Sequence, residues 1–477
     1  MKKVLIALAL ALTCAAASAK VELPNFISDN MVPQQQTSVA LWGTATPGKK
    51  VTLSPGWTKS KTVVQADPAT GKWFARVATP AAGGPYDIVI SDGEKRTVRN
   101  VLIGEVWFCS GQSNMEMPVM GYGSQPSKGS TERIVCARPE RPIRMCKIEK
   151  HSITTPQDTV ITAGWQVHSP EAVARTSATA YYFADYLQNV IGIPVGILES
   201  DWGGSSIETW LDEKTIREKF DGEFDLGYLQ TGEINPKRRH QDPCLLYNGQ
   251  VHALVPYTFK GMLWYQGETN RGRPEQYIRL QAAYVEMMRT LFEVPDAPFY
   301  FVQIAPYPYG EPDAWHSGYF VEAQQKSLAV IPNSGMAATV DIGEYGTIHP
   351  NRKDEVGRRL ALLALQNDYG VRGIEAEAPT YKSLSIEDGK ALVTFNVGPL
   401  GLNPMGQDLD GFEIAGADKV FHPVKARLKN GTTFTVWSDA VPEPVAVRYC
   451  FRNWGVGTVF NAFGIPLTPF RTDDWQL

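Results

Sequence analysis

The stretch Gly104–Pro118, GEVWFCSGQSNMEMP, passes from an apolar segment directly into a polar turn. A short apolar run that ends in turn residues is typical of a buried strand in a parallel sheet, and we expect one over Leu102–Cys109. The turn that follows places a small hydroxyl, Ser113, where the buried strand ends. This stretch therefore predicts the first strand of an α/β sheet and marks its end as a candidate site.

Downstream of this strand, apolar runs and helical spacing alternate as far as about residue 370. Alternation at this scale indicates a parallel sheet with helices on both faces. Two long gaps, 118–176 and 203–259, are predicted to be loop-rich lids or rims. The later strands are expected at Val195–Glu199, Lys260–Trp264, Phe299–Ile304 and Gly335–Val340, and the helices at Ser177–Leu187, Pro274–Leu291, Tyr319–Leu328 and Lys353–Gln366.

Short alternating strands with Gly and Pro turns precede and follow the α/β region. This rhythm indicates a small β-sandwich before it and a second β-domain after it. The predicted organisation is a signal peptide (1–19), an N-terminal β-sandwich domain (20–101), a catalytic α/β domain (102–370) and a C-terminal β domain (371–477).

The first residues have the pattern of an export signal. Lys2 and Lys3 precede an apolar run, and Ala17–Ala19 fits cleavage after Ala19. The run is too short to span a membrane, so we expect a secreted or periplasmic protein with no membrane insertion after cleavage. Lipidation at Cys14 is the alternative, and the residues before it, Leu12-Thr13, lack the small side chain expected there.

Charge and cysteine content exclude some functions. Removing residues 1–19 takes away two lysines and no acid, which changes the net charge from −4 to −6 and argues against a nucleic-acid partner. No CxxC or Cys/His spacing suggests a metal site, and no cofactor is implied. Cys136 and Cys146 could close a small loop, and the sequence does not decide between a disulfide and free thiols. The oligomeric state is likewise not predicted.

Four polar motifs follow predicted strands: Gln112-Ser113, Asp201–Gly204, Gln266–Glu268 and Asp341–His349. In an open α/β sheet, ligands bind outside the carboxyl ends of the strands, so the four motifs are expected to converge at one edge. Ser113 would be a nucleophile there if a base lies within hydrogen-bond reach.

His349 is the candidate base, because histidine titrates near neutrality and this one follows the last strand of the sheet. Taken alone, Ser113 would also fit a helix N-cap and His349 a turn residue. For the two residues taken alone, these structural roles are the more common ones.

Four blocks in order carry a family resemblance: CSGQSNM (109–115), WGGSSIETW (202–210), WYQGETN (264–270) and IHPNRKDEVGRRLA (348–361). With them, the chain resembles the SGNH (GDSL-like) hydrolases, specifically their sialate O-acetylesterase branch. The resemblance implies an SGNH-type three-layer α/β/α sheet flanked by two β-sandwich-like domains. It also implies Ser113 as the nucleophile and His349 as the general base. The implied oxyanion donors are Ser113, Gly204 (with Gly203 as its alternative) and Gln266 (with Asn270 as the weaker candidate).

The acid of the triad departs from the family pattern. Many SGNH enzymes have an aspartate three residues before the histidine, where this chain has Gly346. We expect Asp341 to orient His349, with Glu344 as an alternative. A backbone carbonyl near Gly346 would instead leave a Ser-His dyad, and Glu268 is a further possibility.

The resemblance implies a serine esterase that removes O-acetyl groups from sialic acids. Trp202, by stacking, and Arg271, by binding a carboxylate, are the expected substrate contacts. Two alternatives remain: an acetylesterase for another acetylated glycan such as xylan or pectin, and a non-catalytic carbohydrate-binding protein.

Overall fold

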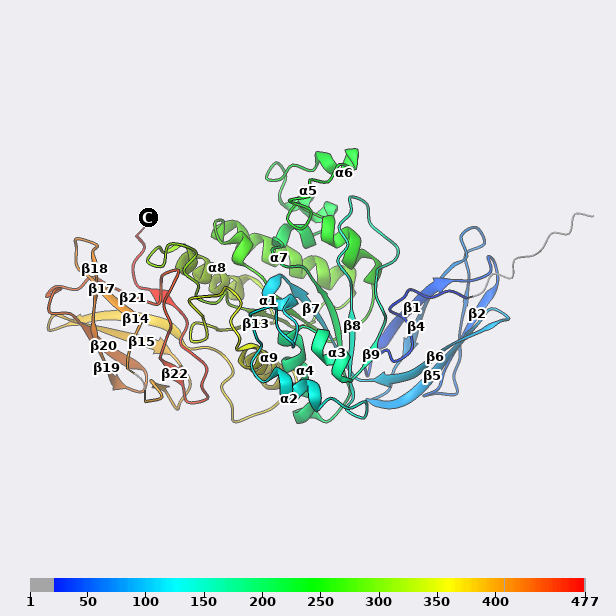
Figure 1. Ribbon diagram of the computed structural model, residues 1–477, viewed down its shortest axis with the longest axis horizontal. Coiled ribbons are helices and arrows are strands. Elements are labelled where there is room, and N and C mark those ends of the chain that lie inside the picture. Colours follow the sequence, from blue (N-terminus) through cyan, green and yellow to red (C-terminus); the bar gives the residue numbers. More distant parts are fainter. Residues whose placement is uncertain (1–20, 407, 476–477) are drawn as a thin grey trace, which may run out of the picture.

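The computed structural model describes residues 21–406 and 408–475, so the expected signal peptide lies outside the described residues. A central α/β body has a β-rich region at each end, which makes the molecule elongated (Figure 1). None of the helices in the described ranges is long and apolar enough to cross a lipid bilayer.

The central sheet has seven strands in the order β13-β12-β11-β7-β10-β8-β9. All neighbours are parallel except β8 and β9. The strands are β7 (Glu105–Gly111), β8 (Ile143–Lys147), β9 (Gln166–Val167), β10 (Val195–Asp201), β11 (Gly261–Tyr265), β12 (Phe299–Val302) and β13 (Ser334–Ala337). The parallel sheet expected from the sequence is confirmed.

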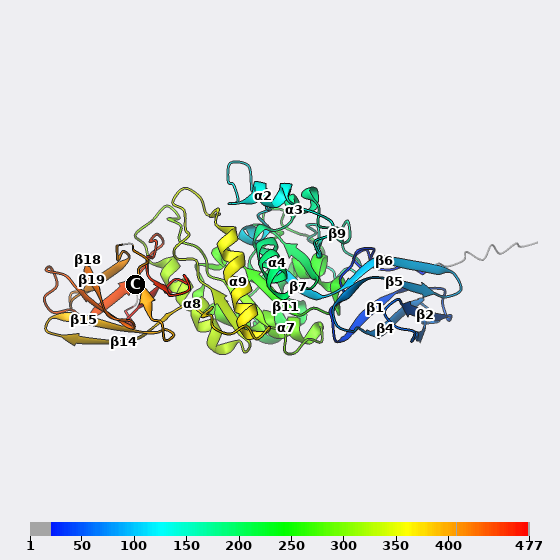
Figure 2. The ribbon, with the colours of Figure 1, turned by 90° about the horizontal axis from the view of Figure 1, so that it is seen from below.

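Helices cover both faces of this sheet because alternate residues of each strand point to opposite sides. In β7, Val106 and Phe108 join the core that contains α7 residues, whereas Trp107 and Cys109 join the core that contains α4 residues. Figure 2 shows α4 and α9 side by side over the sheet. The four long helices match their predictions in position: α4 (Ala178–Ile191), α7 (Pro274–Leu291), α8 (His316–Val330) and α9 (Lys353–Asn367).

One prediction about this region is corrected. The apolar run Leu102–Cys109 is not one strand: β6 (Lys95–Ile103) belongs to the N-terminal sheet, and β7 starts after Gly104. A Cβ at Gly104 would lie 2.1 Å from the Pro194 carbonyl oxygen, so only glycine fits where the chain passes from one sheet to the next. The gap 118–176, predicted to be loop-rich, also contributes β8 beside β10. Both gaps also contain short helices between their loops: α2 (Ser130–Val135), α3 (Pro170–Arg175), α5 (Glu213–Lys219) and α6 (Gly227–Thr231).

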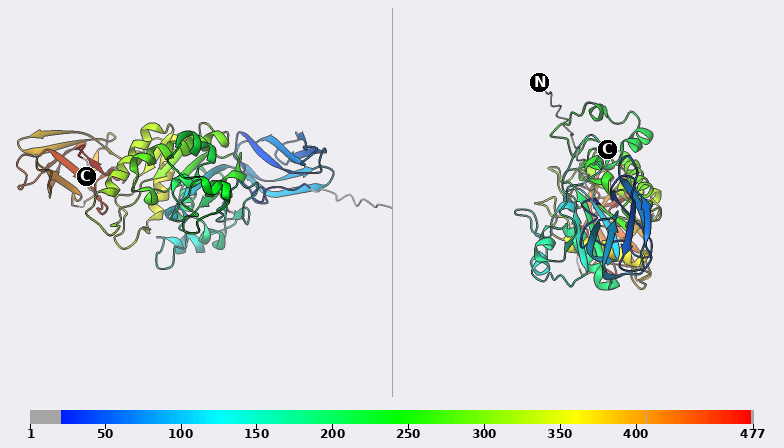
Figure 3. Two further views of the ribbon diagram at one scale, coloured as in Figure 1. Left: turned by 90° about the horizontal axis from the view of Figure 1, so that it is seen from above. Right: turned by 90° about the vertical axis from the view of Figure 1, so that its right-hand side faces the viewer.

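Each terminal region pairs two main antiparallel sheets around a shared core (Figure 3). The N-terminal sheets are β1-β4 and β3-β2-β5-β6, and the C-terminal sheets are β14-β15-β20-β19 and β18-β17-β21-β23, with the small pair β16-β22 beside them. Their strands are β1 (Ser38–Thr44), β2 (Lys50–Pro55), β3 (Thr62–Gln65), β4 (Lys72–Ala78), β5 (Gly83–Ser91), β14 (Thr380–Glu387), β15 (Lys390–Asn396), β16 (Leu402–Asn403), β17 (Phe412–Ala415), β18 (Phe421–Pro423), β19 (Lys425–Asn430), β20 (Thr433–Trp437), β21 (Ala446–Tyr449), β22 (Phe460–Asn461) and β23 (Phe470–Arg471).

The five cysteines of the described ranges are all free thiols. Cys136 is exposed and Cys146 is buried on β8, so the small disulfide loop that the sequence allowed does not form.

The strand order locates the site. Strand β10 lies on one side of β7 and β11 lies on the other. The loops that follow these two strands therefore leave the sheet on opposite sides of the carboxyl end of β7. Such a switch in strand order opens a crevice at the carboxyl ends of parallel strands. The loop after β7 contains Ser113.

Candidate active site

Ser113 stands on a tight turn between β7 and the short helix α1 (Ser113–Glu116). Gly111 makes this turn possible: its φ is +147°, and a Cβ there would lie 2.2 Å from the Tyr265 carbonyl oxygen. The Gln112 amide donates to that same carbonyl (2.9 Å), which fixes the turn against β11. Ser113 is half-buried, unlike its fully buried neighbour Asn114, so it is not part of the core.

The fully buried side chain of Asn114 joins the serine turn to two other loops. Its Nδ2 donates to Glu268 Oε1 after β11 (2.7 Å) and to the Ile348 carbonyl (3.1 Å), next to His349. Asn114 therefore brings the serine and histidine segments together at one edge of the sheet.

His349 lies against the loop 118–129. Its Nδ1 is 2.7 Å from Gln125 Oε1, and its ring packs edge-on against Tyr122, with 5.4 Å between the centroids. The Tyr122 hydroxyl in turn donates to the Ser113 carbonyl (3.2 Å). Tyr122 thus contacts both the Ser113 backbone and the His349 ring. Asn114 links the same two segments a second time.

The surroundings of His349 keep its imidazole neutral. Burial, with a smaller contribution from the Lys353 ammonium, lowers the pKa of His349 to about 4, and Glu116 opposes this shift. A neutral ring whose Nδ1–H donates to Gln125 has a lone pair on Nε2, which can accept a proton.

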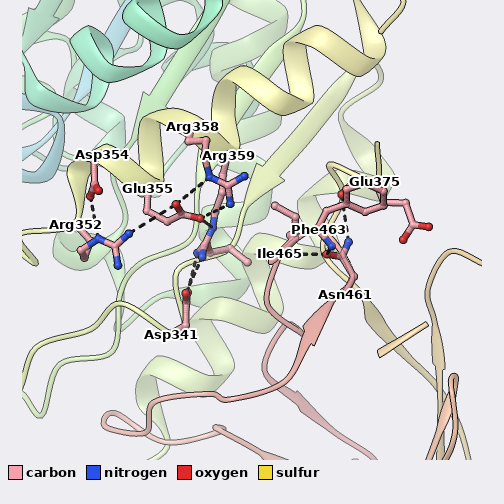
Figure 4. Close-up of polar contacts among 11 residues, drawn as sticks. Asp341, Arg352, Asp354, Glu355, Arg358, Arg359, Glu375, Asn461, Phe463 and Ile465 are labelled. Atoms are coloured by element: carbon pink, nitrogen blue, oxygen red, sulfur yellow. Dashed lines mark hydrogen bonds and ion pairs between the residues drawn. The ribbon is translucent and has the colours of Figure 1, made fainter. Parts of the chain in front are cut away.

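The predicted acid, Asp341, is held in an ion pair. Both of its carboxylate oxygens are bound by Arg359, at 2.7 and 2.6 Å, as Figure 4 shows. Arg359 is only 2% exposed, and a buried guanidinium requires a paired carboxylate, which Asp341 supplies. Glu344 is also engaged, since its Oε1 accepts from the Asn351 amide (2.6 Å). The neutral amide of Gln125 stands where an acid was expected.

This assignment makes Asp341 a stability residue. We expect Asp341→Asn to reduce the free energy of unfolding by about 2 to 4 kcal/mol, because it leaves the buried Arg359 with less compensation. The kcat per folded molecule should stay within about threefold of the wild type, since Asp341 does not contact His349. Urea unfolding and turnover of a chromogenic acetate ester measure the two effects. Glu355→Gln, which removes the other carboxylate bound to Arg359 (3.0 Å), is the matched control. A loss of more than about 100-fold in kcat with the fold intact would restore Asp341 to the site.

The glycine turn after β10 packs directly on the serine. A Cβ at Gly203 would lie 3.3 Å from Ser113 Cβ. The Gly203 amide already donates to the Glu116 carboxylate, so it is not the donor for an oxyanion. Gly204 has φ +74°. Its backbone amide stays the predicted oxyanion donor of this turn.

Gln266, the predicted third oxyanion donor, has its amide nitrogen engaged inside the protein. It is fully buried, and its Nε2 donates to the Ser205 carbonyl (3.1 Å) and to Asn270 Oδ1 (2.7 Å). Asn270, the weaker candidate, donates its own amide to Glu208 (2.8 Å). A buried amide must find partners inside the protein, and here these partners brace the loop after β11.

The two predicted substrate contacts differ in exposure. Trp202 is 8% exposed and stacks on His240 at 6.1 Å, with the Arg239 guanidinium 5.3 Å from its ring centroid. The Arg271 guanidinium lies 3.5 Å from the ring centroid of Tyr309, but the residue is half-buried and its Nη1 has no hydrogen-bond partner in the described part of the chain. Trp202 is therefore largely covered, and the contact of Arg271 with a substrate carboxylate stays a prediction.

The structure adds residues that sequence reasoning missed. Lys150 and Arg239 form a cationic rim beside the Gly203-Gly204 turn: Lys150 pairs with Glu116 (2.5 Å), and the Arg239 guanidinium is 5.3 Å from the Trp202 ring centroid. Burial, together with Arg239 and Lys150, lowers the pKa of the neighbouring His240, whose Nε2 is 3.2 Å from the Cβ position of Gly204. These residues and Gln125 come from the two gaps predicted as loops, where no periodicity singles them out. Lys353 had a signal, because a lysine at the start of an apolar helix face, four residues after His349, is unusual.

A comparison with protein families identifies residues 103–366 with the family described as "Carbohydrate esterase, sialic acid-specific acetylesterase". Two curated relatives are similar over most of their length. The chain is 27% identical to the sialate O-acetylesterase of Mus musculus, over 90% of this chain and 89% of that protein. It is 26% identical to the sialate O-acetylesterase of Homo sapiens, over 90% of this chain and 87% of that protein.

Among solved structures, the chain is similar to one from Xanthomonas citri that is described as a novel carbohydrate acetylesterase. The TM-score is 0.85 and the sequence identity is 34%, over 95% of this chain and all of that chain.

Proposed function

We propose a serine mechanism for this chain, which belongs to the carbohydrate esterase family of sialic acid-specific acetylesterases and is therefore a carboxylic ester hydrolase. Membership of an esterase family sets aside the alternative of a non-catalytic carbohydrate-binding protein. The observation that supports the mechanism is the packing of the Ser113 turn, the His349 segment and the Gly203-Gly204 turn at one sheet edge. On the same grounds, we assign the central sheet to the SGNH type. From the sequence pattern, we assign the first 19 residues to an export signal for the periplasm or the exterior.

In the first step, His349 Nε2 takes the Ser113 hydroxyl proton while Ser113 Oγ attacks the acetyl carbonyl carbon. The tetrahedral intermediate collapses by breaking the bond between that carbon and the sugar oxygen, and the imidazolium returns its proton to this oxygen. Water, deprotonated by His349, then attacks the acetyl carbon of the acetyl-Ser113 ester. The bond between that carbon and Ser113 Oγ breaks, the imidazolium returns its proton to Oγ, and acetate is released. Gln125 fixes the tautomer by accepting from Nδ1–H, so the pair works as a dyad held by an amide.

The negative charge of the intermediate needs donors that are in place beforehand. The Ser113 and Gly204 amides are the two that we assign, because Gly203, Gln266 and Asn270 are engaged elsewhere. Each such donor is worth about 3 kcal/mol of transition-state stabilisation.

The substrate that we propose is an O-acetylated sialic acid. The family and the curated relatives support it by their names, and the cationic rim gives a physical reason. Sialic acids have a carboxylate, and the exposed Arg239 beside the Gly204 turn can bind one. The alternative is another acetylated glycan such as xylan or pectin, because the similar Xanthomonas citri protein is described only as a carbohydrate acetylesterase.

Acetate release from an O-acetylated sialic acid and from acetylated xylan distinguishes the two substrates. With the sialic acid as substrate, Arg239→Gln should raise KM about tenfold, the loss of roughly 1.4 kcal/mol from one exposed ion pair. KM for a chromogenic acetate ester, which has no carboxylate, should not change. Arg238→Gln is the matched control, because its guanidinium is held by Asp242 (2.7 Å). Faster release from xylan by the wild type, or an equal effect of Arg239→Gln on both esters, would favour the other glycans.

A further inference from the structure

Lys353, the first residue of α9, is fully buried directly beneath the proposed site. Its Nζ donates to Asn114 Oδ1 (2.7 Å) and to the Pro350 carbonyl (2.9 Å). One acceptor adjoins Ser113 in sequence and the other adjoins His349. A single ammonium group therefore ties the residue after the nucleophile to the residue after the base.

The same amide also binds a carboxylate. Asn114 Nδ2 donates to Glu268 Oε1 while Asn114 Oδ1 accepts from Lys353, so an acidic and a basic side chain are bound at the two ends of one amide. The second carboxylate oxygen, Glu268 Oε2, is buried and has no hydrogen-bond partner in the described part of the chain. Burial of these groups is costly, and a methionine would fill the space of Lys353 without that cost.

We propose that Lys353 is a positioning residue for this esterase: by clamping Asn114 and Pro350 together, it holds the His349 segment against the serine turn. The inference rests on the proposed serine mechanism. Lys353 does not touch the reacting atoms, so it acts only through Asn114 and the backbone of the histidine segment.

The ammonium also acts on His349 through space. It contributes to the lowered pKa of His349, after burial. Burial lowers the pKa of Lys353 itself to about 7, and Glu268 and Glu344 oppose this shift, so Lys353 is charged throughout the acidic range in which His349 must stay neutral. The ionisable and aromatic groups that face this pair are Glu268 after β11, Tyr265 on β11 (5.5 Å from Nζ to the ring centroid), Glu344 before the histidine, Glu116 on α1 and Tyr122 in the loop 118–129.

The test compares Lys353→Met, which keeps the volume and removes the charge and the donors, with Lys353→Gln, which keeps a donor without the charge. We expect Lys353→Met to lower kcat for a chromogenic acetate ester about 100-fold, the effect of a displacement near 1 Å at the reacting centre. KM should change less than about threefold. Lys353→Gln should recover part of kcat, because one of the two hydrogen bonds can re-form.

The pH profile of kcat/KM separates this role from a purely structural one. The acidic limb of the wild type should lie near pH 4, and in both variants it should move toward the ordinary histidine value of about 6.5. Arg448→Met is the matched control: Arg448 is equally buried and pairs with Asp473 (2.8 Å) in the C-terminal region, so it should reduce stability but leave kcat and the limb unchanged.

A kcat within threefold of the wild type and an unmoved limb in Lys353→Met would overturn the proposal. Should Lys353→Met not fold, a wild-type kcat and an unmoved limb in Lys353→Gln would overturn it as well. Failure of the serine mechanism is seen separately, because turnover would then persist when Ser113 itself is removed.

Discussion

Ser113→Ala is expected to lower kcat for a chromogenic acetate ester by about 10⁴- to 10⁶-fold, because no other group takes the place of the attacking oxygen. The fold should be unaffected, since Ser113 is half-buried and the turn is held by the Gln112 backbone and by the Asn114 side chain. KM and the urea midpoint should therefore stay close to those of the wild type. Stopped-flow release of the chromogenic alcohol should show an initial burst only when Ser113 is present.

Ser110→Ala is the matched control for this experiment. Ser110 lies on β7, three residues before Ser113, and is fully buried. Loss of its hydroxyl should change kcat by less than about threefold. A fluorophosphonate probe should label the wild type and Ser110→Ala at residue 113 and leave Ser113→Ala unlabelled. Turnover above about 1% of the wild-type rate in Ser113→Ala would exclude Ser113 as the nucleophile.

The sequence was sufficient for the elements that depend on local pattern. The helix Pro274–Leu291 was predicted with its observed bounds, because proline at its first position and a 3.6-residue apolar repeat both act locally. The serine turn was also predictable, since Gly111 and Ser113 follow an apolar strand in a way that only a close turn explains. The start of β7 was not, because the apolar run continues through Gly104 into a different sheet.

The partners of the polar side chains could not be predicted, because they depend on contacts far apart in the sequence. Asp341 pairs with Arg359, 18 residues later. Several other carboxylates in the sequence were equally plausible partners for this arginine. Gln125 meets His349 across 224 residues, from a segment without periodicity. Gln266 follows its strand as expected, but the direction of its amide is decided by Ser205 and Asn270. A motif thus predicts where a loop lies better than which way its side chains point.

His349→Ala is expected to cost about as much as the loss of the nucleophile, a decrease of roughly 10⁴- to 10⁶-fold in kcat. Without a base within reach, the Ser113 hydroxyl keeps its proton at neutral pH and is a poor nucleophile. The double variant Ser113→Ala/His349→Ala should be no slower than either single variant, because the two residues act as one unit. Steady-state turnover of the chromogenic ester by all three variants measures this coupling.

Gln125→Ala distinguishes loss of the base from loss of its orientation. The imidazole remains but its Nδ1–H loses the acceptor at 2.7 Å, so we expect an intermediate decrease of about 10- to 100-fold. Free imidazole in the buffer should restore part of the activity of His349→Ala, whose cavity opens on the crevice, and none of that of Ser113→Ala. Additive losses in the double variant would mean that Ser113 and His349 work independently, and no dyad would then join them.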